Sequence, residues 1–391
     1  MLPRRLKIGC FILEGLNSFA TTYYFSYFYF FMQTAYGFGN RANLTLAALN
    51  GAVYAVMAWQ GGKFAQRFGY FTALKVGFVI MMGALVVGSQ LHSASGHIVV
   101  MAVAVVGMCF TWPTLEALVS EGETRAGVQR MVGIYNMTWA GTAAVGFFSG
   151  GAMLEKLGSQ SLFYVPVAIQ IIQLGLTFWL ESQARQAAPA RVTESAPPTP
   201  DPHPHTPALT QMFLRLAWLA NPFAYIAINT LIAVIPGVAK HLDLSTMVAG
   251  FCCSTWCFSR LGAFYVLWRW NGWHYRFRWL VTAYVALIIT FAAILMAPNL
   301  TVLLLAQIVF GCVAGLIYYS SLFYSMDLGD TKGEHGGIHE AAIGLGNFAG
   351  PAVGAASLYF LPQYANSGTI AVSALLLLGL GGLLAIRRKG T

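Results

Sequence analysis

The chain has 391 residues, of which 57% are hydrophobic and only 9% are charged, and its mean hydropathy is +0.64. A water-soluble protein of this length could not bury that much apolar surface, so the composition excludes a soluble globular protein and predicts that lipid is the solvent. The formal net charge of +9 could suggest a nucleic-acid partner. We expect no nucleic-acid partner, because the basic residues are distributed as they are in membrane proteins, mostly on the predicted cytoplasmic side.

Apolar runs long enough to cross a bilayer, roughly 17–25 residues each, follow one another along the whole chain. Twelve helices are predicted near residues 8–34, 43–62, 72–91, 97–118, 131–151, 162–180, 213–237, 246–268, 279–297, 301–325, 337–360 and 367–386. The first follows the basic stretch "MLPRRLK", but it is too long for a signal peptide, so we expect it to be retained. The fold class is therefore all-α integral membrane.

The first predicted helix carries a polar face that begins at Glu14. At about 100° per residue, four polar side chains lie within roughly 80° of it: Asn17, Ser18, Thr21 and Thr22. We predict that this face lines a cavity, with Asn17 and Thr21 as solute contacts and Glu14 as a proton-coupling or gating residue. The alternative is that Glu14 extends to the membrane surface, since it lies near the start of the span.

The fourth predicted helix places Trp112 and Glu116 one turn apart on one face, within "FTWPTLEALVS". Pro113 frees a backbone carbonyl there and permits a kink. A charge at mid-bilayer costs on the order of 2.5–3.5 kcal/mol, so Glu116 needs a function. Glu116 is a candidate for proton coupling or gating and Trp112 for solute binding, although a single Trp is often only an interfacial anchor or a core residue.

Residues 181–212 form a stretch rich in Pro, Ala, Ser and Thr without an apolar period, which predicts an extended cytoplasmic linker. The flanking segments repeat at an offset of 204 residues: "NSFA" at 17–20 recurs as "NPFA" at 221–224. The same offset carries Gly107, Gly146 and Gly150 onto Gly311, Gly350 and Gly354, and Tyr135-Asn136 onto His339-Glu340. We expect two six-helix bundles, residues 1–180 and 213–391.

This layout and two motifs resemble the major facilitator superfamily over essentially the full length. "GKFAQRFG" (62–69) looks like the glycine-acidic-arginine signature between its second and third helices, and "GTAAVGFFSGG" (141–151) looks like the glycine-rich fifth-helix motif of exporters. Gln66 stands where the family has Asp, Phe147 stands where the exporter motif has Pro, and the fourth helix lacks the arginine of many proton-coupled members. The residues of the predicted conformational motifs are Gly62, Gln66, Arg67, Gly146, Gly150, Gly350 and Pro351.

The spacing of the glycines can also be interpreted without reference to the family. Gly346, Gly350 and Gly354 recur at every fourth residue, and Gly146 and Gly150 share that spacing in the first half. Small residues at this spacing let two membrane helices approach closely. The surfaces they form could slide during transport or could serve static packing only.

In the second half, the seventh predicted helix carries Asn221, Tyr225 and Asn229 on one face, and the tenth contains Tyr319 and Ser320 within "IYYSSLFYS". Helices one, four, seven and ten line the central cavity in the resembled family, and these are the helices with polar stripes. The predicted solute contacts are Asn17, Thr21, Trp112, Tyr225, Asn229, Tyr319 and Ser320.

Three further polar residues lie in predicted spans of the second half. Arg260 lies about 13 Å deeper than Arg269, at 1.5 Å per residue, and cannot lose its proton. It therefore needs a carboxylate partner such as Glu340, or an anionic group of the substrate. His339 and Glu340 open the eleventh helix and could load and release a proton, or could act as a gate that pairs with Arg260 or the basic loop 269–278.

With the N-terminus inside, 19 of the 22 Lys and Arg residues fall on the cytoplasmic side, and only Arg41, Lys156 and Lys240 fall outside. This positive-inside bias and the even number of spans predict that both termini are cytoplasmic. All six cysteines lie in predicted spans and are expected to be packing residues; a soft-metal site at Cys252, Cys253 and Cys257 is the less favoured alternative.

The sequence contains neither a phosphate-binding loop nor a nucleophile elbow or zinc-ligand pattern, so we expect no enzyme activity, cofactor or metal. Our interpretation is a secondary active transporter that moves a small polar or amphipathic organic solute by alternating access, coupled to protons. The alternatives are a drug or metabolite efflux antiporter and, in another class, a non-transporting membrane sensor. We expect a monomer in the lipid bilayer of a bacterial inner membrane.

Overall fold

The computed structural model of the chain describes residues 4–121, 123, 125–186, 207–328 and 332–389. Every regular element in these ranges is a helix. The first six are α1 (Arg4–Tyr36), α2 (Asn40–Phe68), α3 (Tyr70–Gly88), α4 (Ala94–Ser120), α5 (Arg125–Leu157) and α6 (Ser161–Gln186). The other seven are α7 (Pro207–His241), α8 (Thr246–Cys253), α9 (Thr255–Arg269), α10 (Phe277–Leu295), α11 (Leu300–Leu328), α12 (Lys332–Phe360) and α13 (Ser367–Lys389). The core of the predicted linker, residues 187–206, lies outside the described residues.

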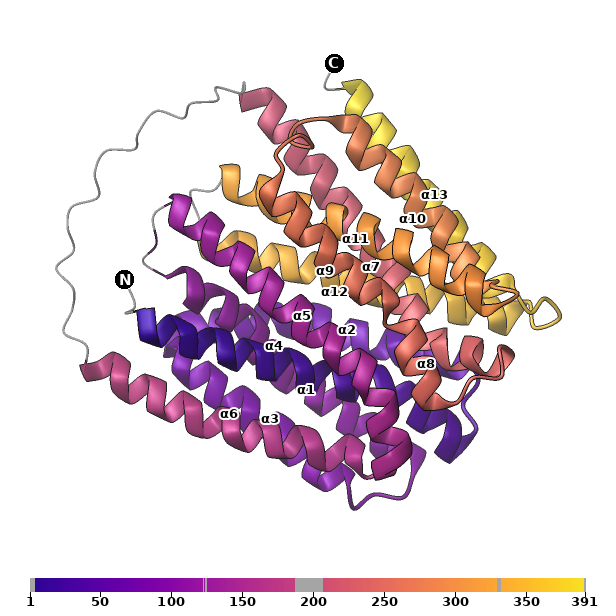
Figure 1. Cartoon of the computed structure of the whole chain (residues 1–391), viewed down its shortest axis with the longest axis horizontal. Coiled ribbons are helices and arrows are strands. Elements are labelled where there is room, and N and C mark those ends of the chain that lie inside the picture. Colours follow the sequence, from indigo (N-terminus) through magenta and orange to yellow (C-terminus); the bar gives the residue numbers. More distant parts are fainter. Residues whose placement is uncertain (1–3, 122, 124, 187–206, 329–331, 390–391) are drawn as a thin grey trace.

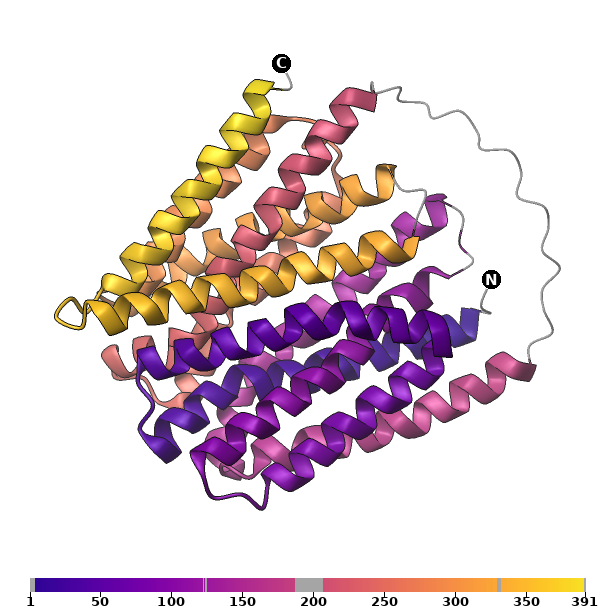
Figure 2. The ribbon, with the colours of Figure 1, turned by 180° about the vertical axis from the view of Figure 1, so that it is seen from behind.

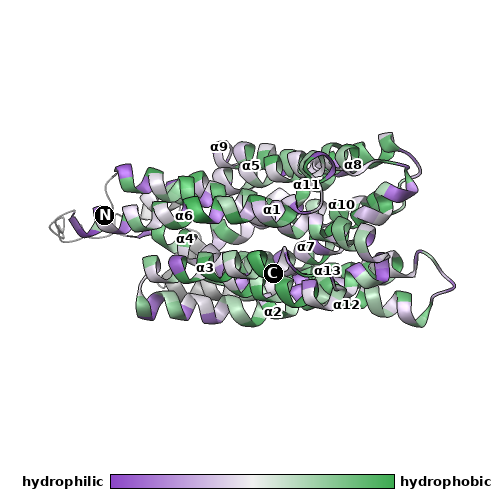
Figure 3. Ribbon diagram, turned by 90° about the horizontal axis from the view of Figure 1, so that it is seen from below, coloured by the Kyte–Doolittle hydropathy of each residue, from purple (hydrophilic) through white to green (hydrophobic). Residues whose placement is uncertain are grey.

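The helices confirm the predicted all-α membrane class. Each predicted span corresponds to one helix, except that α8 and α9 divide the eighth span at Ser254, whose hydroxyl donates to the Phe251 carbonyl at 3.0 Å. Such a bond back to the preceding turn competes with the helix ladder and favours a bend. Nine of the described helices are long and apolar enough to cross a membrane. Apolar side chains such as Val99, Ile289 and Leu378 are more than half exposed on the outer surface, where Figure 3 shows broad hydrophobic flanks.

Figure 1 shows α1–α6 on one side of the molecule and α7–α13 on the other. The N-terminus, the C-terminus and the start of α7 all lie at one end, which we call the terminal side, whereas α8 and the turn between α12 and α13 lie at the opposite end, the far side. The same arrangement is seen from behind in Figure 2, where the two helix sets come together at the far side and diverge toward the terminal side.

The two helix sets meet mainly through α2 against α12 and through α5 against α8 and α9. Near the middle of α2 and α12, and at the far side between α5 and α8, these contacts bring backbone close to backbone. A side chain at Gly151 on α5 would overlap the carbonyl of Thr246 on α8, and one at Gly51 on α2 would overlap the backbone of Asn347 on α12. On the terminal side, α5 and α9 meet through a side chain, with Trp268 against Gly133.

The glycine stripes pack mostly within each helix set. Gly146 lies against the Phe19 carbonyl and Gly150 against Tyr23 and Tyr27, all on α1, while Gly346 and Gly350 lie against the backbone of α7. Gly354 differs, since it contacts Leu44 of α2 across the two sets. These glycines therefore pack mainly inside their own helix set, and the close approach between the sets is made by Gly51, Gly151 and Gly344.

Candidate solute and proton site

Three glutamates lie inside the protein where the two helix sets meet. Glu14 on α1 is fully buried, Glu340 on α12 is 5% exposed and Glu116 on α4 is half-buried. The charges of Glu116 and Glu340 both act on Glu14, and Glu340 also acts on Glu116. The structure therefore brings together three proton-coupling candidates that are far apart in the sequence.

Two of these carboxylates accept hydrogen bonds from hydroxyl groups. Ser18 donates to Glu14 at 2.7 Å from the next turn of α1, and Tyr54 of α2 donates to Glu340. The Tyr54–Glu340 bond crosses between the two helix sets. Glu116 differs from both, because no donor among the described residues contacts its carboxylate. The side chain of His339, the remaining candidate at this end of α12, lies outside the described residues.

Arg260 is not paired with Glu340. In the described part of the chain no carboxylate lies within 4.0 Å of its guanidinium, which instead lies 4.6 Å from the ring centre of Trp139 on α5 and 4.7 Å from that of Trp256. Arg260 is 6% exposed, and its Nε has no hydrogen-bond partner. Cation–π contacts are worth about 0.5–2 kcal/mol each and hold the guanidinium in place without neutralising its charge.

Buried polar atoms without a partner in the described structure gather around these charges. Asn17 on α1 and Asn221 on α7, which are equivalent in the internal repeat, are each 1% exposed, and neither makes a side-chain hydrogen bond. Further unpartnered atoms belong to Trp112, Asn136 and Trp256. Burying polar groups without partners is costly, and a concentration of them indicates a place that binds water or a polar solute.

Aromatic rings connect the charged groups across the interface. Trp139 packs edge-on against Trp112 at 5.9 Å and against Tyr318 at 5.5 Å, and Tyr225 lies 6.3 Å from Tyr318. The sequence analysis did not select Trp139, Tyr54 or Tyr318 for the site. The sequence did contain a signal that could have identified Trp139 as a site residue. It lies one helical turn after Tyr135-Asn136, the pair that the internal repeat matches to His339-Glu340.

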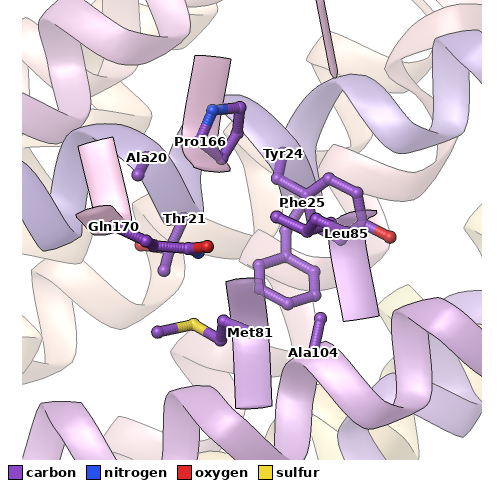
Figure 4. Close-up of a pocket in the computed structure, with 9 residues that line it drawn as sticks. All are labelled: Ala20, Thr21, Tyr24, Phe25, Met81, Leu85, Ala104, Pro166 and Gln170. Carbon is purple, nitrogen blue, oxygen red and sulfur yellow. The ribbon is translucent and has the colours of Figure 1, made fainter. Parts of the chain in front are cut away.

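The other predicted solute contacts have partners within the protein. Asn229 donates to Asn347 of α12, Ser320 donates to the Ile317 carbonyl at 2.8 Å, and Tyr319 packs against Phe264 and Trp273. Thr21 donates to the Asn17 carbonyl at 2.7 Å and lines a cavity of about 10 Å³ inside the first helix set. Figure 4 shows the polar groups of Gln170 and Tyr24 beside that cavity, which has room for about one water molecule.

The predicted signature between the second and third helices lies on the terminal side. Gln66 is exposed, and Arg67 lies in the last turn of α2 with its guanidinium 5.2 Å from the Phe68 ring centre. Nothing lies within 4 Å of the position a side chain would take at Gly62. Gly69, with φ of 92°, makes the turn into α3, a conformation that favours glycine. Within the described residues, no group of three or more His, Cys, Asp or Glu is arranged to hold a metal ion.

Comparison with known proteins identifies relatives of this arrangement. The family model of the Major Facilitator Superfamily matches residues 10–351. No curated protein sequence matches the chain. Among solved structures, an auto-inhibited peptide transporter of the POT family aligns with a TM-score of 0.75, 13% identity, and 98% and 97% coverage of this chain and of that chain. The nucleoside transporter NupG aligns with a TM-score of 0.67 at 13% identity, covering 98% of each chain. The human organic anion transporter MFSD10 aligns with a TM-score of 0.68 at 14% identity, covering 98% and 100%.

Proposed function

Because the chain belongs to the Major Facilitator Superfamily, we propose that it is a secondary active transporter that moves a small polar or amphipathic organic solute by alternating access, coupled to protons. The observation that carries this proposal is the group of three interior glutamates, the buried Glu14 and Glu340 and the half-buried Glu116, among unpartnered polar atoms where the two helix sets meet. A hydrophobic interface needed only for folding would not hold such groups.

The division of the helices supports alternating access between two bundles, residues 1–180 and 213–391. The two sets are held together at the far side by the backbone contact at Gly151 and approach closely at Gly51 near the middle of α2, and they diverge toward the terminal side (Figure 1). With the termini in the cytoplasm, as the distribution of Lys and Arg indicates, this arrangement corresponds to an inward-facing conformation. Rocking the bundles about the central cluster would open the far side.

Glu14 and Glu340 are the better candidates for the proton. Each is buried and already accepts a hydrogen bond from a hydroxyl group, so each can be held in place in both protonation states. Glu340 also contacts Tyr54 across the two sets, which would link its protonation to their relative movement. Gating without proton transfer is the alternative for both residues.

The test is proton movement in proteoliposomes that contain a pH-sensitive dye. A panel of sugars, amino acids, nucleosides, organic acids and cationic drugs would be applied to the wild type, Glu14→Gln and Glu340→Gln, with Glu121→Gln as the control because Glu121 is exposed at the end of α4. We expect a solute-dependent proton signal that at least one interior variant loses and the control keeps. Solute flux that is equal in all variants and carries no proton signal would refute the coupling.

The same experiment separates the alternatives. Solute and proton moving in opposite directions would identify an efflux antiporter, the function associated with the glycine motif at residues 141–151. If no solute of the panel moved under any gradient, transport itself would be refuted in favour of a non-transporting sensor.

A further inference from the structure

The interior contains charges of opposite sign that do not neutralise each other. The described part of the chain has two buried Lys or Arg side chains, Lys7 and Arg260. Lys7 forms an ion pair with Glu123, whereas Arg260 has only the Trp139 and Trp256 rings beside it. Since guanidinium cannot lose its proton and its burial is costly, an anionic partner would stabilise it strongly.

The acidic counterpart is Glu116. Unlike Glu14 and Glu340, it accepts no hydrogen bond in the described structure, and it is half-buried where they are buried. One turn away on the same helix face, the indole nitrogen of Trp112 is buried without a partner. Glu116 is therefore the carboxylate of the cluster that is free to bind a cation.

Aromatic rings connect Arg260 to the helix face that carries Glu116. The Arg260 guanidinium lies 4.6 Å from the ring centre of Trp139, and the Trp139 ring packs at 5.9 Å against that of Trp112, one turn of α4 from Glu116. Trp139 also packs at 5.5 Å against Tyr318, which lies 6.3 Å from Tyr225. The arrangement has a positive end at Arg260, a negative end at Glu116 and aromatic surface between them.

We infer that the transported solute is a small zwitterion whose carboxylate binds Arg260 and whose ammonium group binds Glu116. This inference rests on the proposed transport function and names its substrate class. The guanidinium, held between Trp139 and Trp256, presents hydrogen-bond donors that suit a carboxylate. The ring faces of Tyr225 and Tyr318 would cover the carbon skeleton between the two charges.

The test uses solutes that differ by one charge. The probes are α-amino acids and dipeptides, each compared with its C-terminal amide, which lacks the carboxylate, and its N-acetyl derivative, which lacks the ammonium group. Binding to the purified full chain would be followed by tryptophan fluorescence, since Trp139 and Trp256 flank Arg260, and uptake would be measured in proteoliposomes. We expect the wild type to bind at least one zwitterion ten-fold or more tightly than either derivative.

Variants then assign each charge to one end of the site. Arg260→Gln should bind the zwitterion and its amide equally, while still discriminating against the N-acetyl derivative, and Glu116→Gln should show the reverse pattern. Arg260→Lys keeps the charge without the guanidinium fork and should bind the zwitterion with intermediate affinity. Arg269→Gln, on the exposed end of the same helix, is the matched control and should behave as the wild type.

Two outcomes would overturn the inference. One is that zwitterions and their amides bind equally to the wild type; the other is that no zwitterion binds while a neutral or cationic solute of the wider panel is transported. In the second case the proposed transport function stands and only the substrate class fails. Transport of no solute at all would refute the proposed function and this inference with it.

Discussion

At the level of single residues, the charges of this protein fall into two groups with different physical roles. Near the terminal side, Lys75 donates to Glu181 at 2.9 Å and Arg185 donates to it at 2.8 Å, so this carboxylate is neutralised between α3 and α6. In the interior, Glu116 and Arg260 have no ionic partner within the described residues. Paired charges serve the fold, whereas unpaired interior charges cost stability, which is why we propose that Glu116 and Arg260 bind a ligand.

The Glu181 pair predicts how stability depends on pH. The hydrogen bond from Lys75 lowers the pKa of Glu181 below its usual value of 4.5. The ionised Glu181 therefore stabilises the folded protein fully above pH 4.5, and this stabilisation is lost as the pH falls through the lowered pKa. Glu181→Gln should reduce stability by about 1 kcal/mol at neutral pH, a value suited to a pair that is only partly buried.

Thermal melting of the detergent-solubilised protein between pH 7 and pH 3 checks this. The melting temperatures of the variant and the wild type should converge as the pH falls below 4.5. Arg185→Gln is the control, because the Arg185 side chain is 76% exposed and should matter less. A gap in melting temperature that stayed constant across the pH range would contradict the assigned role of Glu181.

The sequence predicted which charges are interior but could not predict their partners. Glu14, Glu116, Arg260 and Glu340 stand out in apolar runs, and the cost of charge in lipid makes that pattern informative. For Arg260 the sequence left two expected partners, a carboxylate such as Glu340 or an anionic group of the substrate, and the contact that the structure shows within the protein is neither. It is a pair of indole rings, one of them on α5, because the contact depends on how α5 packs against α9 and local periodicity does not encode that.

At the level of elements, the start of α8 depends on a side chain from α5. Glu155 accepts a hydrogen bond from the backbone N–H of Met247 at 2.9 Å, in the first turn of α8. A carboxylate at a helix N-terminus satisfies an unpaired N–H group and complements the helix dipole. That hydrogen bond lowers the pKa of Glu155, so the cap is fully formed at neutral pH and is lost as the pH falls below 4.5 through the lowered pKa.

Glu155→Gln should weaken this cap and the contact it makes between the two helix sets. Hydrogen exchange of the α8 amides, corrected for the intrinsic effect of pH, should be several-fold faster in the variant at pH 7 and equal to the wild type in strong acid. Lys156→Gln removes only an exposed ion pair, 4.0 Å from Lys156 Nζ to Glu155 Oε1, keeps the Glu155 cap and should change exchange much less. If the α8 amides were equally protected from hydrogen exchange in Glu155→Gln and in the wild type, the Glu155 cap would not stabilise α8.

Hydropathy predicted where the helices lie because each span is a run of apolar residues of bilayer length. It could not predict the division of the eighth span at Ser254, whose hydroxyl donates to the Phe251 carbonyl. The glycine spacing indicated close helix contacts but not their direction. Only packing shows that Gly146 and Gly150 face α1, while the next residue, Gly151, faces α8.

At the level of the whole molecule, the orientation in the membrane is a prediction that the fold leaves open. Both termini lie on one side (Figure 1), and the Lys and Arg distribution predicts that this side is cytoplasmic. Green fluorescent protein fused after Thr391 should therefore fluoresce in intact bacterial cells, while alkaline phosphatase fused at the same place should be inactive. Active phosphatase with a dark fluorescent fusion would reverse the assigned sides.

The last prediction concerns the balance between the two conformations that transport requires. A methyl group at Gly151 would overlap the Thr246 carbonyl. Because the atoms that it would meet belong to the backbone of α8, the strain can be relieved only by separating α5 from α8. Overpacking of this kind costs roughly 1–3 kcal/mol, which is enough to change the ratio of two conformations about 5- to 150-fold. Gly151→Ala should therefore populate a state that is open on the far side.

Spin labels at Ser159 and His241, exposed far-side positions on the two helix sets, would report this opening as a longer distance in pulsed electron resonance. The native cysteines would be replaced first, since Cys312 is exposed. Gly83→Ala is the matched control, because nothing lies within 4 Å of its added methyl group. If Gly151→Ala kept the wild-type distance distribution while remaining folded, the backbone contact of α5 with α8 would not be what holds the far side closed, and alternating access would have to use the α2–α12 contact instead.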